Sequence, residues 1–260
     1  MNKKIGFIGL GKMAKAIIRG IFYQNPQAKI FGYDPFAQIE NVEMLSSNKE
    51  VAEKADIIFI CTKPFVIKDV LEEIKTNLTD DKLVVSIAAG ISLSILEASL
   101  NKNQRIIRIM PNTPALVGQG AFALSKGQFA TREDIEIIKN LLSDIGTVIE
   151  QPEDKMDIIT ALSGSGPAFY YFLIDKMAKG AVKLGLDYET ALKLSAQTAL
   201  GSAKMILNSD MSVEDLITAV TTKGGCTEVG NNILNSSNIA EILDKTIKDT
   251  AIKAEQLGKN

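Results

Sequence analysis

The stretch Ile5-Gly6-Phe7-Ile8-Gly9-Leu10-Gly11-Lys12-Met13-Ala14 determines the fold prediction for this chain. Residues 5–9 form a short apolar run typical of a buried strand, and apolar side chains recur with helical spacing from Lys12 to Tyr23. Between them lies a G-x-G-x-x-A turn, a motif that is informative only when it follows a strand and opens a helix. Both conditions are met, so a turn that contains glycines by coincidence is the weaker interpretation.

Each small residue of this turn has a physical role. Gly9 permits the tight bend, Gly11 leaves room for a pyrophosphate beside the backbone, and Ala14 lets the helix pack closely on the strand. The helix N-terminus adds unpaired N–H groups and the positive end of the helix dipole. The turn therefore predicts a dinucleotide site with these cofactor-binding residues: Gly9, Leu10, Gly11, Lys12, Met13 and Ala14.

The chain beyond the turn continues to alternate between strand-like and helix-like segments. Alternation of this kind predicts an α/β domain with a mostly parallel sheet and right-handed crossovers. The expected strands are 29–33, 56–62, 83–87 and 106–110, with further candidates at 120–124 and 147–150.

The second part of the chain has a different pattern. After residue 150 we expect only helices, at about 167–183, 188–208, from 213 onward and 238–257. Gln151-Pro152-Glu153 marks the change of pattern. We therefore expect a dinucleotide-binding domain at 1–151 and an all-α domain at 152–260. The small residues of its helices suit close packing, either in an internal core or against another subunit.

Composition excludes several kinds of function. The 260 residues include 29 Lys and Arg, 31 Asp and Glu, and no His, so a Ser-His-Asp triad and a His-ligated metal site are excluded. The near-balanced charge argues against a nucleic-acid partner. Cys61 and Cys226 form no CxxC pair, so we expect no metal and a reducing compartment.

The N-terminus does not resemble a signal peptide and no apolar run is long enough for a membrane span, so we expect a cytoplasmic protein without a membrane partner.

Further candidate residues follow the predicted strands. In an open parallel sheet, ligands bind outside the carboxyl ends of the strands. Three such ends carry turns at 62–64, 88–90 and 110–114, the last stiffened by prolines on both sides of Asn112-Thr113. The candidates among them are Thr62, Lys63, Pro64, Ala89 and Asn112.

Asp34 follows the second predicted strand. An acid there commonly accepts a hydrogen bond from the ribose 2′-hydroxyl and disfavours a 2′-phosphate, which indicates NAD. Asp34-Pro35 is also an ordinary way to start a turn, so both interpretations stay open.

A second anion site is predicted in the helical part. A helix expected near Glu228 is preceded by Thr221-Thr222-Lys223-Gly224-Gly225-Cys226-Thr227. Consecutive glycines before a helix can form a backbone nest for a carboxylate or phosphate, and a flexible loop between helices is the other interpretation. Without a His beside it, Cys226 is better interpreted as a small filler residue than as a nucleophile. Ser163-Gly164-Ser165-Gly166-Pro167 is not G-x-S-x-G, so we expect a hinge or helix entry there.

Taken together, these motifs resemble the pyrroline-5-carboxylate reductase family along essentially the whole chain. The more specific segments are Met110-Pro111-Asn112-Thr113-Pro114, Ser163-Gly164-Ser165-Gly166-Pro167-Ala168 and Lys223-Gly224-Gly225-Cys226-Thr227. Lys63-Pro64 and the glycine turn also match in order and spacing. Lys223 in place of a frequent Pro, and Cys226 in place of Thr or Ala, are departures from the family pattern.

The resemblance implies a Rossmann domain followed by a helical dimerisation domain. It implies reduction of 1-pyrroline-5-carboxylate to L-proline, the last step of proline biosynthesis, with NADPH as cofactor and NADH as the other candidate. It places the cofactor against the glycine turn and against Asn48, Thr62, Lys63, Pro64 and Ala89, and the substrate carboxylate on Gly224, Gly225, Cys226 and Thr227. It also implies a homodimer that completes the site, and in many members a decamer of five dimers.

The implied chemistry agrees with the lack of His. Protonation of a cyclic imine makes its carbon a hydride acceptor, and solvent can supply that proton. We expect the nest to fix the carboxylate and the Thr227 hydroxyl to lie near the imine nitrogen, which makes Thr227 the predicted catalytic residue.

Two alternatives remain at this stage. A β-hydroxyacid dehydrogenase has a similar architecture but uses a helical Lys as acid and base, and Lys176, Lys179 and Lys183 have the spacing of a solvated face instead. A non-catalytic NAD(P)H sensor would need no small-anion site, and the 224–227 nest argues against it.

Overall fold

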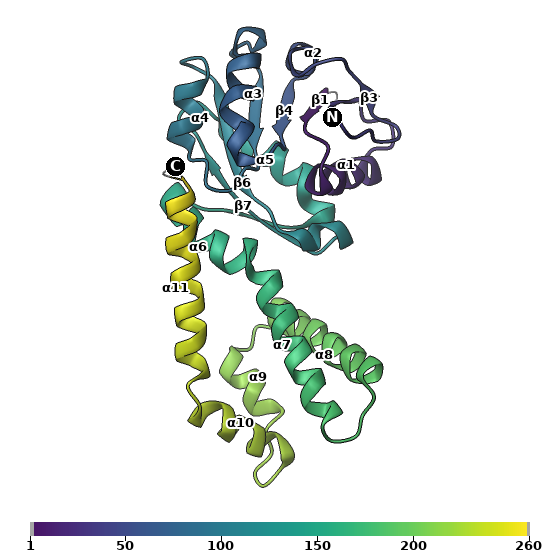
Figure 1. Ribbon diagram of the computed structural model, residues 1–260, viewed down its shortest axis with the longest axis vertical. Coiled ribbons are helices and arrows are strands. Elements are labelled where there is room, and N and C mark those ends of the chain that lie inside the picture. Colours follow the sequence, from purple (N-terminus) through teal and green to yellow (C-terminus); the bar gives the residue numbers. More distant parts are fainter. Residues whose placement is uncertain (1–2, 259–260) are drawn as a thin grey trace. The chain divides into compact units, whose positions relative to one another are not determined.

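The computed structural model of the chain describes residues 3–258. Its first part is an eight-stranded sheet in the order β3-β2-β1-β4-β5-β6-β7-β8 (Figure 1). All neighbouring strands are parallel except β6 and β7, which run antiparallel. The mostly parallel sheet expected from the sequence is confirmed. The strands are β1 Ile5–Ile8, β2 Ile30–Tyr33, β3 Glu43–Met44, β4 Ile57–Ile60, β5 Leu83–Ser86, β6 Arg105–Met110, β7 Gly120–Lys126 and β8 Gly146–Glu150.

Helices cover both faces of this sheet, which explains why the central strands are apolar along their whole length. Every residue of β1, β4 and β5 is buried, as expected for parallel strands covered on both sides. Phe7 and Phe59 stack face to face across β1 and β4, with ring centroids 4.9 Å apart. One apolar cluster involves α1 Lys12–Gln24 and α5 Arg132–Leu142; the other involves α2 Asn48–Lys54, α3 Ile67–Ile74 and α4 Leu93–Ser99.

The strand order reverses at β1. Its two neighbours are β2, which follows α1 in the chain, and β4, which begins the second half of the sheet. A crevice at the carboxyl ends of the strands opens at such a reversal, and this is where open α/β sheets bind ligands. The glycine turn that follows β1 lies at this point.

A short helix at Met156–Ile159 was not predicted, and the helices that follow it agree with the sequence prediction. Asp187 caps α8, where its carboxylate accepts from the N–H of Thr190 at 2.9 Å. Ser212 caps α9, where its hydroxyl accepts from the N–H of Asp215 at 3.1 Å. The helices are α6 Met156–Ile159, α7 Gly166–Val182, α8 Tyr188–Asn208, α9 Val213–Ala219, α10 Cys226–Ser236 and α11 Ile239–Gly258. None of the helices in the described part of the chain combines the length and apolarity needed to cross a membrane.

The Ser163–Pro167 segment is a helix entry. A π-helical turn at Thr160–Gly164 connects α6 to α7, and Ser165 donates its N–H to the carbonyl of Thr160 at 2.8 Å. A π-helical turn of this kind holds an extra residue per turn and often marks a functional segment. Residue patterns do not reveal it, since its sequence composition is that of a loop.

The compact units of the structure differ from the predicted domain ranges. The first unit runs to Ser165 and resumes at Lys248, and the second is Gly166–Ile247. Residues 152–165 stay with the sheet because Met156 packs with Met110 and Ala123. Glu153 also pairs with the buried Arg108 on β6, with Oε1 and Nη1 2.6 Å apart.

Candidate cofactor and substrate sites

Gly9 brings the turn after β1 against the end of β4. Its φ is +89°, and a Cβ added to it would lie 2.9 Å from the carbonyl carbon of Cys61. Its N–H donates to the carbonyl of Tyr33 on β2 at 2.9 Å. Only glycine combines this left-handed backbone with such close approach, so the tight bend expected at Gly9 is present.

Gly11 leaves open space where the helix begins. It is the N-cap residue of α1, its side chain position has no heavy atom within 4 Å, and no side chain caps the helix there. The N–H groups of the first turn of α1 point out of the helix without an intrahelical acceptor. A pyrophosphate can approach these groups and the positive end of the helix dipole, so the residues present fit a dinucleotide.

Asp34 joins the end of β2 to the glycine turn. Its Oδ2 accepts from the N–H of Leu10 and its Oδ1 from the N–H of Phe36, both at 2.8 Å. The bond to Phe36 is the turn contact expected of Asp34-Pro35. The bond to Leu10 was not anticipated from the sequence, and it gives Asp34 a role in shaping the turn.

The end of β4 contributes a polar atom without a partner. The hydroxyl oxygen of Thr62 is buried and makes no hydrogen bond with the described residues. Buried hydroxyls are almost always paired, so an unpaired one beside the glycine turn suits a ligand contact. Lys63 and Pro64 follow, exposed, where Pro64 opens a 3-10 turn. Burial raises the pKa of the Cys61 thiol, which therefore stays protonated and unreactive.

The segments that follow β5 and β6 contact other residues of the first unit. Ala89 is exposed, and Gly90, with φ of +76°, lies against the backbone of Leu257 and Gly258 at the end of α11. Asn112 donates from Nδ2 to the carbonyl of Ser163 at 3.1 Å and accepts at Oδ1 from the N–H of Ala121 at 2.8 Å. Its amide thus holds the loop after β6, and contact with a cofactor stays a prediction.

Asn48 is the first residue of α2, next to the N-cap Ser47. Its Nδ2 donates to Oε2 of Glu73 on α3 at 2.8 Å, which fixes the side chain between the two helices. The residues that the sequence assigned to the cofactor therefore all belong to the first unit. The glycine turn follows β1, which runs parallel to β4, and β4 runs parallel to β5, so the ends of these three strands share the carboxyl edge of the sheet.

The 224–227 segment lies in the second unit and opens α10. Gly224 has φ of +73°, and its N–H donates to Oε2 of Glu228 at 2.8 Å. The N–H of Gly225 donates to the carbonyl of Thr222 at 2.9 Å. Two N–H groups of the predicted nest are therefore used inside the loop. The N–H groups of Cys226 and Thr227, in the first turn of α10, lack a side-chain cap and suit a carboxylate.

Sequence reasoning missed Glu228. It is the third residue of α10, and a Glu at this position commonly reaches back to an N–H near the N-cap, so a signal existed. Because its carboxylate already accepts from Gly224, it helps to fix the loop that the sequence assigned to the substrate.

The helical lysines have the environment of a solvated face. Lys179 pairs with Asp175 at 2.8 Å, and that hydrogen bond raises the pKa of Lys179, which disfavours it as a base. Lys176 lies over the ring of Phe172, 4.9 Å from its centroid. Groups of three or more metal-ligating side chains do not occur among residues 3–258.

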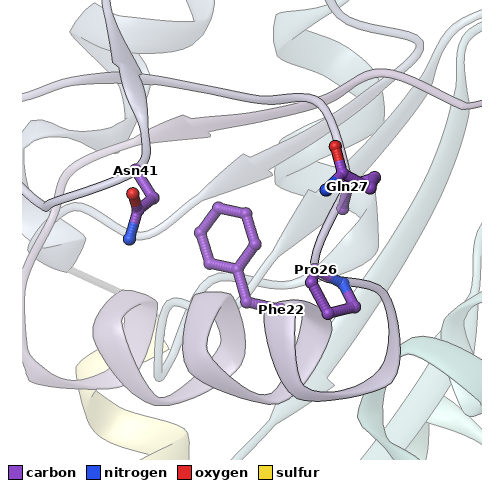
Figure 2. A pocket seen from close by; sticks show the side chains of 5 residues that line it. Phe22, Pro26, Gln27 and Asn41 are labelled. Carbon is purple, nitrogen blue, oxygen red and sulfur yellow. The ribbon is translucent and has the colours of Figure 1, made fainter.

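A separate hollow of about 400 Å³ lies beside the C-terminal end of α1. Figure 2 shows the ring of Phe22 rising from the helix between Asn41 on one side and Gln27 and Pro26 on the other. The 13 residues of α1 span about 20 Å, so this hollow is almost a helix length from the glycine turn. It is not part of the nucleotide crevice.

Comparison with known proteins identifies the families whose models and members this chain resembles. The family model described as pyrroline-5-carboxylate reductase dimerisation matches residues 153–257, and one described as NADP oxidoreductase, coenzyme F420-dependent, matches residues 4–90. The pyrroline-5-carboxylate reductase of Methanosarcina acetivorans is 37% identical, with 99% of each chain covered. That of Arabidopsis thaliana is 35% identical, with 99% of this chain and 96% of the relative covered.

Solved structures of the same kind of enzyme also match this chain over nearly its whole length. A pyrroline-5-carboxylate reductase from Coxiella burnetii matches with a TM-score of 0.94 and 33% identity over 100% of both chains. The Plasmodium falciparum pyrroline carboxylate reductase with NADP bound matches with a TM-score of 0.89 and 34% identity, covering 99% of this chain and 98% of that one. The glycine turn, the uncapped start of α1 and the full-length similarity lead to one conclusion: this chain belongs to the pyrroline-5-carboxylate reductase family.

Proposed function

We propose that the protein reduces 1-pyrroline-5-carboxylate to L-proline with NAD(P)H, the last step of proline biosynthesis. The observation that carries the proposal is a pair of helix N-termini without side-chain caps, each preceded by glycine. One starts α1 after Gly11, and the other starts α10 after Gly225. Two such ends suit two anionic groups, a pyrophosphate and a small carboxylate.

The chain's own groups would bind and orient the reactants. The cofactor supplies a hydride when bound. The N–H groups that open α1 hold the pyrophosphate, and those of Cys226 and Thr227 hold the substrate carboxylate. The carbon of the substrate's protonated C=N bond would accept that hydride, and the electron pair of the double bond would move to nitrogen to give a neutral secondary amine. Solvent supplies the imine proton, and the Thr227 hydroxyl orients that nitrogen, so positioning provides most of the catalysis.

The protein acts as a homo-oligomer in this proposal, with a homodimer as the basic unit. The second unit has only three buried residues in the single chain, Gly166, Ala178 and Ala191. Large apolar side chains are exposed along its helices instead, among them Tyr171, Met177, Leu194, Leu207, Val229 and Ile233. The family model that covers this region is named for dimerisation. Assembly of five dimers into a decamer, and a cytoplasmic location, are further parts of the proposal.

A spectrophotometric assay tests the reaction. Oxidation of NADPH and of NADH is followed at 340 nm with 1-pyrroline-5-carboxylate, and proline formation is measured in the same samples. We expect stoichiometric consumption of cofactor and formation of proline. A parallel panel of β-hydroxyacids with NAD⁺ or NADP⁺ should give no reduction of the cofactor. Tight cofactor binding without turnover of the imine would instead support a sensor.

A further inference from the structure

The carboxylate of Asp34 is fixed by backbone from two segments. Its Oδ2 accepts from the N–H of Leu10, inside the glycine turn, and its Oδ1 accepts from the N–H of Phe36 in the loop that follows β2. Both bonds are 2.8 Å long. The side chain is therefore held beside the turn, at the end of β2, and would have to break both bonds to swing away.

This position meets the part of the cofactor in which NADH and NADPH differ. In folds of this kind the adenosine ribose of a dinucleotide lies at the end of the second strand. NADH has a 2′-hydroxyl there, which can donate to a free lone pair of a carboxylate oxygen. NADPH has a 2′-phosphate there, which carries between one and two negative charges and only accepts hydrogen bonds.

The loop around Asp34 offers no cation to a phosphate. Residues 30–48 contain no Lys or Arg, whereas Asp34, Glu40 and Glu43 are acidic. Two lysines lie near β2, but both sit over the ring of Phe31, with Nζ 5.4 Å (Lys29) and 5.8 Å (Lys54) from its centroid. Phe31 precedes Asp34 by three residues, about 10 Å along an extended chain.

Lys54 is also paired with acidic side chains, and a third lysine, Lys12, lies in the first turn of α1. Lys54 pairs with Glu50 at 2.9 Å and with Glu43 at 3.5 Å. Lys12 lies in the first turn of α1, where its charge favours the pyrophosphate that both cofactors share. A 2′-phosphate at the end of β2 would therefore meet a fixed negative charge without a matching positive one.

We propose that Asp34 makes this protein select NADH over NADPH. It accepts the ribose 2′-hydroxyl and repels the 2′-phosphate, while its bonds to Leu10 and Phe36 keep the carboxylate in place. The inference rests on the proposed function, because it specifies which nicotinamide cofactor that reaction uses. Two unit charges 4 Å apart in water change an affinity about fivefold, so a phosphate that carries about 1.5 to 2 charges gives a preference of about tenfold or more.

Binding measurements on the intact protein test this without reference to turnover. Dissociation constants of NADH and NADPH are measured by the change in nicotinamide fluorescence at a fixed ionic strength. We expect NADH to bind at least about tenfold more tightly, with the preference shrinking as salt screens the repulsion. Equal or tighter binding of NADPH by a protein that still reduces the imine overturns this inference alone. Binding of neither cofactor overturns the proposed function as well.

Three variants locate the preference at Asp34. Asp34→Asn keeps one oxygen acceptor and removes the charge, so the NADH preference should fall about tenfold. Glu40→Gln removes an exposed acid from the same loop and should leave the ratio within twofold; an equal fall in both variants would assign the preference to the general charge of the loop. Lys12→Ala should weaken both cofactors by the same factor.

A fourth variant covers the case in which Asp34→Asn does not fold. The side chain of Phe36 is 97% exposed, and its backbone N–H donates to Asp34 whatever the side chain. Phe36→Arg thus adds a cation beside an intact carboxylate and should raise the affinity for NADPH relative to NADH. An unchanged ratio in this variant overturns the proposal.

Discussion

Gly9 and Gly11 are two residues apart, yet they require glycine for different reasons. Gly9 has a left-handed backbone and no room for a Cβ beside Cys61, whereas Gly11 has an ordinary φ of −70° and open space. Gly9→Ala should therefore lower the free energy of unfolding by at least about 2 kcal/mol, from backbone strain and the clash with the strand end. Thermal unfolding should show this as a fall in Tm of roughly 4–8 °C.

Gly11→Ala is the matched control for that change. Its methyl group meets no heavy atom within 4 Å, so only the weaker N-cap should count, and the melting temperature should fall by about 1–3 °C, less than for Gly9→Ala. The same methyl group stands where a pyrophosphate would approach, so dinucleotide affinity should fall. Equal melting temperatures for the two variants would contradict the strain argument at Gly9.

Thr227 lies exposed in the first turn of α10, and in the proposed mechanism its hydroxyl orients the imine nitrogen. Thr227→Ala should lower kcat by about 10- to 100-fold, the range expected for one hydrogen bond to a charged group, with little change in the cofactor dissociation constant. Thr222→Ala removes a hydroxyl from the same loop and should leave kcat close to the parent value. Steady-state kinetics of both variants measure the contribution of the Thr227 hydroxyl to kcat. An unchanged kcat in Thr227→Ala would remove this residue from the mechanism.

At the scale of elements, the strands that are apolar along their length were predictable because burial on both faces leaves a continuous signal. β1, β2, β4, β5 and β6 lie where the sequence placed them, each within one or two residues. The two-residue β3 was missed because Glu43 and Met44 form too short a pattern. In the candidate sites, the glycine roles followed from local chemistry, but the contacts of Asp34 with Leu10 and of Asn112 with Ser163 join segments 24 and 51 residues apart. No local pattern encodes such pairings.

The connection between β8 and α7 is secured by a buried charge. Arg108 on β6 is only 4% exposed, and Glu153 accepts both from Arg108 Nη1 at 2.6 Å and from the N–H of Leu93 at 2.8 Å. Glu153→Gln leaves the guanidinium buried without its counter-charge. Because Glu153 itself is 30% exposed, we expect a loss of about 2 kcal/mol in unfolding free energy, less than for a fully buried pair.

Urea denaturation of the Glu153→Gln variant measures that loss. Asp154→Asn changes the neighbouring acid, whose ion pair with Lys155 lies on the surface, and should leave the urea midpoint unchanged. A midpoint for Glu153→Gln equal to that of the parent would mean that the buried pair contributes no net stability.

At the scale of the whole molecule, the second unit cannot be stabilised by its own core. Residues 166–247 bury two alanine side chains and no larger apolar side chain in the single chain. Burial of apolar area is the dominant favourable term in folding, and an 82-residue unit with so little of it would not offset the entropy of ordering its backbone. Its exposed apolar side chains therefore require cover, and a second copy of the same surface meets that requirement with the closed symmetry typical of homo-oligomers.

The need to cover these side chains predicts the mass of the oligomer in solution. It also predicts that one charged side chain placed on this surface will dissociate the oligomer. Light scattering should give a multiple of 28.1 kDa for the parent, at least the dimer. Ile233, 64% exposed on α10, should be covered by the partner, so Ile233→Glu should shift the mass toward one chain and lower the melting temperature. Tyr23→Glu places the same charge at an 82% exposed site of the first unit and should change neither. A monomeric parent that melts cooperatively would contradict this prediction. The second unit would then be folded in water with its apolar side chains, Ile233 among them, exposed to solvent.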